Sequence, residues 1–147
     1  MKQLSNLIIF CDGASRGNPG LSSSAFVAVD DQEQIVYQQG KFLGITTNNV
    51  AEYHAVLLAL NWLLTLVPSP YPLSPTINLD SELLYKQITG KYKIKAPHLI
   101  PLMHQIHQLL TDLKHQNLII KFQHQLRSHN HQADALCNQI LDQQSTS

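Results

Sequence analysis

One short apolar run near the N-terminus limits what this chain can fold into more than any other feature. Residues Leu7 to Cys11 are apolar without interruption, and Asp12 and Gly13 follow at once. A strand without polar alternation has no face for water, so it belongs in the middle of a sheet that is covered on both sides. The run therefore predicts a central strand between layers of helices, with a carboxylate at its end.

The rest of the sequence alternates between strand and helix patterns. Strands are predicted at residues 7–11, 24–29, 34–39, 76–79 and 118–125, and helices at residues 49–67, 81–89, 98–115 and 131–141. The first three strands would form an antiparallel meander that begins with a turn at residues 17–20. Prolines between residues 68 and 75 predict a stiff connection without regular structure. This order predicts a mixed α/β sheet with helices on both faces.

Composition favours a single globular domain. Of the 147 residues, 44% are hydrophobic and 14% are charged, which suits a buried core rather than a disordered chain. We predict one domain over residues 1–147, with an ordered core from about residue 5 to residue 142. The first apolar run is too short for a signal peptide, and the apolar stretch at 56–67 is too short to span a bilayer. We therefore expect a soluble cytoplasmic protein.

The cysteines and histidines do not indicate a metal site of their own. Cys11 and Cys137 lie far apart in the sequence and form no CxxC pair, so we expect two reduced, buried thiols. The eight histidines show no metal-ligand spacing.

Four acidic residues stand in distinct local patterns. They are Asp12 in Asp-Gly-Ala-Ser-Arg-Gly-Asn-Pro-Gly, Glu52 in Thr-Thr-Asn-Asn-Val-Ala-Glu-Tyr, Asp80 in Asn-Leu-Asp-Ser-Glu-Leu, and Asp134 in Asn-His-Gln-Ala-Asp-Ala-Leu. Because each follows a predicted strand or opens a predicted helix, the four are candidates for one site at an edge of the sheet. Clustered carboxylates repel one another unless cations neutralise them, and oxygen ligands of this kind suit Mg²⁺ or Mn²⁺.

Each carboxylate also has a purely structural explanation. Glu52 lies three residues after Asn49, which is the spacing of a capping box. Asp80 precedes a helix and could be its N-cap. Asp134 lies in the first turn of the last helix, where a negative charge suits the helix dipole. Asp12 could belong to a turn, although a place beside the core is costly for an ion that has no partners.

Taken in order and spacing, the four patterns resemble type 1 ribonuclease H from about residue 7 to about residue 141. The resemblance implies a ribonuclease H-like five-stranded sheet, with three antiparallel strands followed by two parallel additions. It also implies an endoribonuclease that hydrolyses the RNA strand of RNA/DNA hybrids and leaves 5′-phosphate and 3′-hydroxyl ends. The four carboxylates would hold two Mg²⁺ ions, which Mn²⁺ could replace. Asp12 would bridge the ions, with Asp80 and Glu52 favouring the ion on the nucleophile side and Asp134 the other.

The same resemblance implies contacts with the substrate. Asn18 in the Gly-Asn-Pro-Gly turn, and Asn48 and Asn49 before the long helix, resemble positions that contact the hybrid. Thr47 resembles a threonine that holds a phosphate. Glu52 resembles a residue that senses a ribose 2′-hydroxyl, the group that distinguishes RNA from DNA. Helix capping is an alternative role for Asn48 and Asn49.

Two departures from the family pattern affect how the chain would hold a polyanion. Glu82 stands where many relatives have glutamine, and an ionised acid cannot donate a hydrogen bond to a base edge. Residues 90–97 are too few for the extra basic helix and loop of some relatives, so the chain resembles the shorter branch of the family. Because the formal net charge is zero, binding of the substrate's phosphates would depend on a local basic patch. We predict that Lys91, Lys93 and Lys95 contact the substrate.

A third departure concerns the loop before the last helix. Many relatives carry a histidine there, whereas Arg127 resembles the arginine of the shorter branch, and we predict an electrostatic role for it in catalysis. His129 and His131 are alternatives for the same role. His124 falls inside a predicted strand and is interpreted as structural.

The RNA/DNA hybrid is the only partner that the sequence predicts, with no membrane and no obligatory protein partner. One alternative is a nuclease of the same fold that acts on another nucleic acid, such as a resolvase or an exonuclease. The Asn-Asn and Gly-Asn-Pro-Gly elements favour the hybrid-cleaving family. A second alternative, a non-catalytic hybrid-binding module, would be plausible if one carboxylate were missing, and all four are present.

Overall fold

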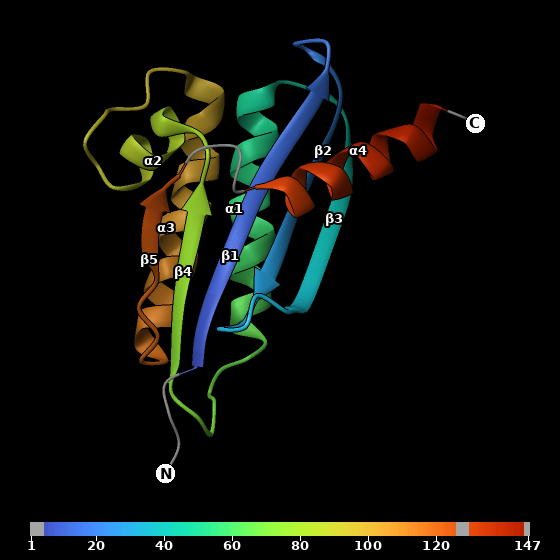
Figure 1. Cartoon of the computed structure of the whole chain (residues 1–147). Coiled ribbons are helices and arrows are strands. Elements are labelled where there is room, and N and C mark those ends of the chain that lie inside the picture. Colours follow the sequence, from blue (N-terminus) through green and yellow to red (C-terminus); the bar gives the residue numbers. More distant parts are fainter. Residues whose placement is uncertain (1–4, 126–129, 146–147) are drawn as a thin grey trace.

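The chain forms one five-stranded sheet with helices on both faces (Figure 1). A computed structural model describes residues 5–125 and 130–145. The strand order is β3-β2-β1-β4-β5, so β1 is the central strand, as predicted. The pairs β1–β2 and β2–β3 are antiparallel, whereas β4 and β5 are added in parallel. The predicted mixed α/β sheet is therefore confirmed.

The strands and helices follow one another along the chain as the periodicities predicted. They are β1 (Ser5–Arg16), β2 (Gly20–Val29), β3 (Ile35–Thr46), α1 (Asn48–Leu64), β4 (Leu73–Leu79), α2 (Glu82–Ile88), the 3₁₀ helix η1 (Pro97–Leu99), α3 (Ile100–His115), β5 (Lys121–His124) and α4 (His131–Ser145). In Figure 1, α4 crosses β1 and β2 on the near face of the sheet, while α1 lies behind it. Within the described residues, no helix is long and apolar enough to cross a membrane.

The first strand is longer than its apolar run predicted. β1 continues beyond Asp12 and pairs with β2 as far as Arg16, which lies opposite Leu21. Its polar second half remains in the strand because β2 satisfies the backbone groups, and a turn at residues 17–19 closes the hairpin. Asp12 therefore lies inside a paired strand, and the explanation of Asp12 as a turn residue is wrong.

The proline-rich connection is shorter than predicted. β4 begins at Leu73 and includes Pro75, which pairs with Leu7 of β1. The ladder between β4 and β5 begins only at Thr76. Pro75 therefore has no ladder bond to supply on the β5 side, which is where a proline is tolerated in a sheet.

The two faces of the sheet carry cores of different size. On the α1 face, side chains of β1, β2 and β4 pack with α1, α2 and α3 in one large cluster that includes Ile9, Phe26 and Ile77. On the α4 face, the buried cluster consists of Val27, Val29 and Ala133, with partly buried Ile8 and Phe10 beside it. Because burial of a large apolar side chain contributes about 1.5–3 kcal/mol, the α1 face supplies most of the hydrophobic stabilisation. α4 depends more on its polar contacts.

Candidate active site

Asp12 and Asp80 lie next to each other on neighbouring parallel strands, Asp12 within β1 and Asp80 directly after β4. Cys11 of β1 is the direct partner of Leu79 at the end of β4, and each aspartate is the next residue along its strand. Asp12 is only 3% exposed, and the Gly13 N–H donates to its Oδ1 at 3.0 Å. The parallel pairing of β1 and β4 thus brings two carboxylate positions to one place.

Helix α1 brings Glu52 to the same place. A Cβ added to Gly13, which follows Asp12, would lie 2.5 Å from both Ala51 C and Glu52 N. On the neighbouring strand, the Ser24 hydroxyl donates to the main-chain oxygen of Ala51. Small residues on β1 and β2 therefore allow the N-terminal half of α1 to lie directly against the sheet, with Glu52 beside the position of Asp12.

The helix caps remove two of the structural explanations. Thr47 caps α1, and its Oγ1 accepts a hydrogen bond from Val50 N at 3.2 Å. The capping box that would have explained Glu52 is therefore wrong, and so is capping as the role of Asn48 and Asn49. Ser81 caps α2, and its Oγ accepts from Leu84 N at 3.1 Å, so the explanation of Asp80 as an N-cap is also wrong.

Helix α4 brings Asp134 towards the middle of β1. Asp134 lies in the first turn of α4, as predicted. Asn130, directly before the helix, donates its Nδ2–H to the main-chain oxygen of Cys11 at 2.9 Å. Seven residues further along, the Cys137 thiol donates to the main-chain oxygen of Asp12 at 3.4 Å. The first two turns of α4 are therefore attached to β1 at two consecutive main-chain oxygens, those of Cys11 and Asp12.

Electrostatic effects on the buried thiols and on Tyr53 reflect this convergence. Burial raises the pKa of Cys137 to about 12, and the charges of Asp12, Asp134 and Asp80 contribute in the same direction. Burial also raises the pKa of Cys11, with Asp12 and Asp80 adding to the effect. The pKa of Tyr53 is raised to about 12 by burial and then by Glu52. Three of the four carboxylates thus act on a single thiol.

The described carboxylate side chains are not arranged as a complete set of metal ligands. Over residues 5–125 and 130–145, no group of three His, Cys, Asp or Glu side chains is arranged so that it could hold a metal ion. The backbone brings the four positions together, while the carboxylates, as like charges, repel one another. The donor set still fits a hard divalent cation in kind, because all four candidate ligands are carboxylates, which supply oxygen atoms.

The residues expected to contact substrate lie around the N-terminus of α1. The Asn18 Oδ1 accepts a hydrogen bond from Asn48 N at 3.1 Å, which joins the turn at residues 17–19 to the helix start. Both asparagines are exposed, and Thr47 is half-buried.

A cavity of about 560 Å³ lies beside this region. It is lined by Asn49, Leu83, Gln87, Lys91, Tyr92, Lys93, Lys95, Ala96 and Leu99. The cavity therefore brings the three lysines singled out in the sequence together with Asn49, although they come from segments about forty residues apart.

Glu82 is engaged on the surface of α2. Its carboxylate pairs with Lys86 at 2.8 Å, and the hydrogen bond from Lys86 lowers the pKa of Glu82. The Lys86 ammonium also donates to the Tyr92 hydroxyl at 3.2 Å and lies 4.8 Å from the centre of that ring. Glu82 is thus tied into a surface network with one wall residue of the cavity.

The loop residues before α4 are only partly described. Arg127 and His129 lie outside the described residues, and His131 is the exposed first residue of α4. His124 is in a strand, as predicted, but it is the last residue of β5 and is exposed. Its ring centroid lies 6.2 Å from that of Tyr85.

Comparison with known proteins supplies relatives for most of the chain. Residues 10–140 match the family model described as reverse transcriptase-like. A bifunctional protein of Mycobacterium tuberculosis is 31% identical over 92% of this chain and 35% of its own length. Ribonuclease HI of Halobacterium salinarum is 35% identical over 90% of this chain and 63% of its own length. Ribonuclease H of Mannheimia succiniciproducens is 30% identical over 92% of this chain and 84% of its own length. The chain thus spans about a third of the mycobacterial relative.

Solved structures resemble the chain over nearly its full length. LC11-RNase H1, isolated from compost and crystallised with an RNA/DNA hybrid, has a TM-score of 0.86 and 32% identity over 96% of this chain and 99% of its own. RNase H1 of Halobacterium salinarum has a TM-score of 0.82 and 33% identity over 94% of this chain and 98% of its own. The foamy virus protease-reverse transcriptase, at 20% identity and a TM-score of 0.70, shares the fold alone.

Proposed function

The chain belongs to the reverse transcriptase-like family of ribonuclease H-like domains, and on that premise we propose that it is an endoribonuclease that hydrolyses the RNA strand of RNA/DNA hybrids. The products would carry 5′-phosphate and 3′-hydroxyl ends. The observation that supports this most is the convergence of the middle of β1, the end of β4 and the N-terminal halves of α1 and α4, which carry Asp12, Asp80, Glu52 and Asp134. Relatives named ribonuclease H or HI support the same activity.

The failure of the structural explanations strengthens the functional one. Thr47 and Ser81 perform the capping that would have accounted for Glu52 and Asp80. Asp12 is in a paired strand and is almost fully buried, a costly place for a carboxylate that only has to maintain the fold. Only Asp134 keeps a structural explanation, its favourable place in the first turn of a helix.

We propose that the four carboxylates hold two divalent cations, Mg²⁺ or, as a substitute, Mn²⁺. When bound, such ions would supply an activated water and neutralise the charge that develops on the leaving 3′ oxygen. Asp12 would contact both ions, Asp80 and Glu52 the ion on the nucleophile side, and Asp134 the other. The Gly13 N–H restrains the Asp12 carboxylate, so the central ligand is oriented before any ion binds.

The substrate would lie across the N-terminus of α1. We propose that the side chains of Thr47, Asn48 and Asn49 receive the hybrid there, because the N–H groups of Asn48 and Val50 already donate to Asn18 and Thr47. Asn18, hydrogen-bonded to Asn48 N, would fix the neighbouring turn against it. Glu52 would sense the ribose 2′-hydroxyl of the RNA strand.

We propose further contacts on either side of this region. Lys91, Lys93 and Lys95 would hold phosphates along the cavity that they line with Asn49. Arg127 would act electrostatically on the reacting strand, because a guanidinium does not lose its proton at neutral pH.

A substrate panel tests the proposed function. Labelled RNA/DNA hybrid, double-stranded RNA and double-stranded DNA are each incubated with Mg²⁺, with Mn²⁺ or with EDTA. We expect cleavage of the RNA strand of the hybrid alone, with either cation and not with EDTA. Cleavage of double-stranded DNA would instead favour a resolvase or an exonuclease, and hybrid binding without cleavage would favour a non-catalytic module.

A further inference from the structure

Asn130 is a buried polar residue that joins the backbones of two carboxylate positions. It is 4% exposed, and its Nδ2–H donates to the main-chain oxygen of Cys11, the residue before Asp12, at 2.9 Å. Its own main-chain oxygen accepts a hydrogen bond from Asp134 N at 3.1 Å. Asn130 is therefore hydrogen-bonded both to the backbone of β1, one residue before Asp12, and to the backbone N–H of Asp134.

Helix capping does not account for this side chain. An asparagine that caps a helix uses its side-chain oxygen to accept a hydrogen bond from an N–H of the first turn. The Oδ1 of Asn130 is buried and receives no hydrogen bond from the described residues. A buried acceptor without a donor is unfavourable. The side chain is therefore held by its bond to Cys11 rather than by the helix that it precedes.

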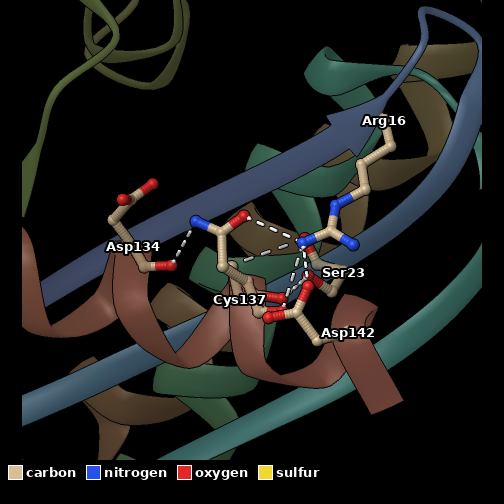
Figure 2. Close-up of polar contacts among 6 residues, drawn as sticks. Arg16, Ser23, Asp134, Cys137 and Asp142 are labelled. Atoms are coloured by element: carbon tan, nitrogen blue, oxygen red, sulfur yellow. Dashed lines mark hydrogen bonds and ion pairs between the residues drawn. The ribbon is translucent and has the colours of Figure 1, made fainter. Parts of the chain in front are cut away.

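The other polar attachments of α4 lie further along the helix. The Ser23 hydroxyl donates to the main-chain oxygen of Cys137 at 2.9 Å, and Arg16 pairs with Asp142 at 2.6 Å. Figure 2 shows these contacts, with Asp134 on the turn that lies away from Arg16 and Asp142. The apolar core on this face is small and includes Ala133 of the first turn, and Asn130 supplies the polar attachment beside it.

We infer that Asn130 is a positioning residue that fixes the first turn of α4, and with it Asp134, relative to Asp12. The inference rests on the proposed function, because the proposed metal site requires a defined distance between Asp134 and the other carboxylates. Asn130 touches neither substrate nor reacting atoms in this role. Loss of its side chain should loosen the start of the helix while the rest of α4 stays attached.

The first test uses metal-free protein and needs no activity. Asn130→Ala removes the side chain, and Asn130→Leu keeps its branched shape without the donor. Ser23→Ala is the matched control, because it also removes one buried hydrogen bond between α4 and the sheet, at Cys137. The exchange of the Asp134 amide hydrogen should be at least tenfold faster in both Asn130 variants than in the control. The comparison is made under conditions in which all variants have the same global free energy of unfolding. Equal exchange in the three variants would overturn the inference.

The second test measures the response to Mg²⁺ alone. The melting temperature is followed as Mg²⁺ is added to the wild type, to the two Asn130 variants and to Ser23→Ala. The half-saturating Mg²⁺ concentration should rise about tenfold in the Asn130 variants and stay at the wild-type value in the control. The same shift in all variants would mean that Asn130 acts only through general stability, which contradicts the positioning role.

The two tests separate this inference from the proposed function. A wild type that neither cleaves the hybrid nor responds to Mg²⁺ would defeat the proposed function, and amide exchange in metal-free protein would still decide the role of Asn130. A wild type that does both, with Asn130 variants that match Ser23→Ala, would leave the proposed function standing and reject the positioning role.

Discussion

At the scale of single residues, small side chains near Asp12 determine how closely the helices lie against the sheet. Gly13 leaves space for the backbone of α1, Ser24 hydrogen-bonds to Ala51 on that helix, and Ser23 hydrogen-bonds to Cys137 on α4. Consecutive residues of a strand point to opposite faces, so the two serines hold one helix on each side of the sheet. Gly13 and Ser24 therefore allow α1 to bring Glu52 close to Asp12, whereas Ser23 holds the middle of α4.

Gly13→Ala should disrupt this approach. The added Cβ would meet backbone atoms of Ala51 and Glu52 at 2.5 Å, and backbone cannot move aside as a side chain tip can. We expect a loss of about 1–3 kcal/mol in the free energy of unfolding, together with a fall in kcat. Gly40→Ala is the control, because its Cβ would meet only side-chain atoms, above all the flexible end of Ile140. Urea unfolding and hybrid cleavage measure both effects, and a stable, fully active Gly13→Ala would contradict the close packing.

Removal of one carboxylate charge should abolish activity without unfolding the protein. Asp12→Asn and Asp80→Asn keep the shape of the side chain and should each lower kcat at least a hundredfold, which corresponds to about 3 kcal/mol of transition-state stabilisation. Asp112→Asn is the matched control and should keep wild-type activity, because Asp112 lies on α3 and its Oδ1 accepts a hydrogen bond from Gln108. If both site variants retained a tenth of the wild-type rate in Mg²⁺, the shared metal site would be wrong.

Arg127 and His124 should respond differently to substitution. Arg127→Ala should lower kcat more than it changes the half-saturating Mg²⁺ concentration, because its proposed role is to act on the substrate rather than on the ions. His124→Ala should act through stability, and only slightly, since the residue is exposed at the end of β5 and makes a ring contact with Tyr85. Measurements of kcat and melting temperature for the two variants distinguish these roles. If His124→Ala lowered kcat and Arg127→Ala changed only the melting temperature, the catalytic role would belong to His124.

The sequence identified residues with strong local patterns and missed those defined by packing. Asp12, Glu52, Asp80 and Asp134 were selected as candidates because each stands in a recognisable motif. Ser23 and Asn130 were not, because their partners lie more than a hundred residues away in the sequence, at Cys137 and Cys11. No local pattern reports a hydrogen bond of that kind.

At the scale of elements, strand ends were harder to predict than strand centres. The apolar run predicted the middle of β1, but the strand continues through polar residues because β2 pairs with them. Likewise β4 begins within the proline-rich segment, where pairing with β1 outweighs the local preference against a strand. Conversely, β5 is shorter than the predicted strand at 118–125, because only residues 121–124 pair with β4. Helix positions were closer, since α1, α2, α3 and α4 each begin within two residues of the predicted start.

The segment between α2 and η1 should contribute binding rather than chemistry. Replacement of Lys91, Lys93 and Lys95 together by alanine should raise KM with little change in kcat, which is the pattern expected when binding of the ground state and of the transition state weakens equally. The log-log salt dependence should also flatten, by about 0.9 for each phosphate that the protein no longer neutralises, if the hybrid behaves as duplex DNA does. A charge-matched triple variant of Lys41, Lys114 and Lys121 is the control. Unchanged KM and salt dependence in the first variant would mean that the hybrid is held elsewhere.

At the scale of the whole molecule, divalent cations should stabilise the fold. A ligand that binds the native state and not the unfolded chain raises the melting temperature by mass action. We expect millimolar Mg²⁺ or Mn²⁺ to raise the melting temperature of the wild type, and we expect the increase to vanish in Asp12→Asn and persist in Asp112→Asn. Thermal unfolding with added cation or EDTA measures this, and an indifferent wild type would count against a paired-metal site.

The order in which the four carboxylates occur along the chain also affects when activity can begin during synthesis. Asp12, Glu52 and Asp80 are made early and belong to the strands and helices that share the larger core. Asp134 is made last of the four, on the helix that attaches to the opposite face. A nascent chain that is still on the ribosome can therefore build most of the sheet while it lacks a complete site. Under the proposed function, the enzyme cannot cut RNA until α4 has emerged from the ribosome and docked on the sheet.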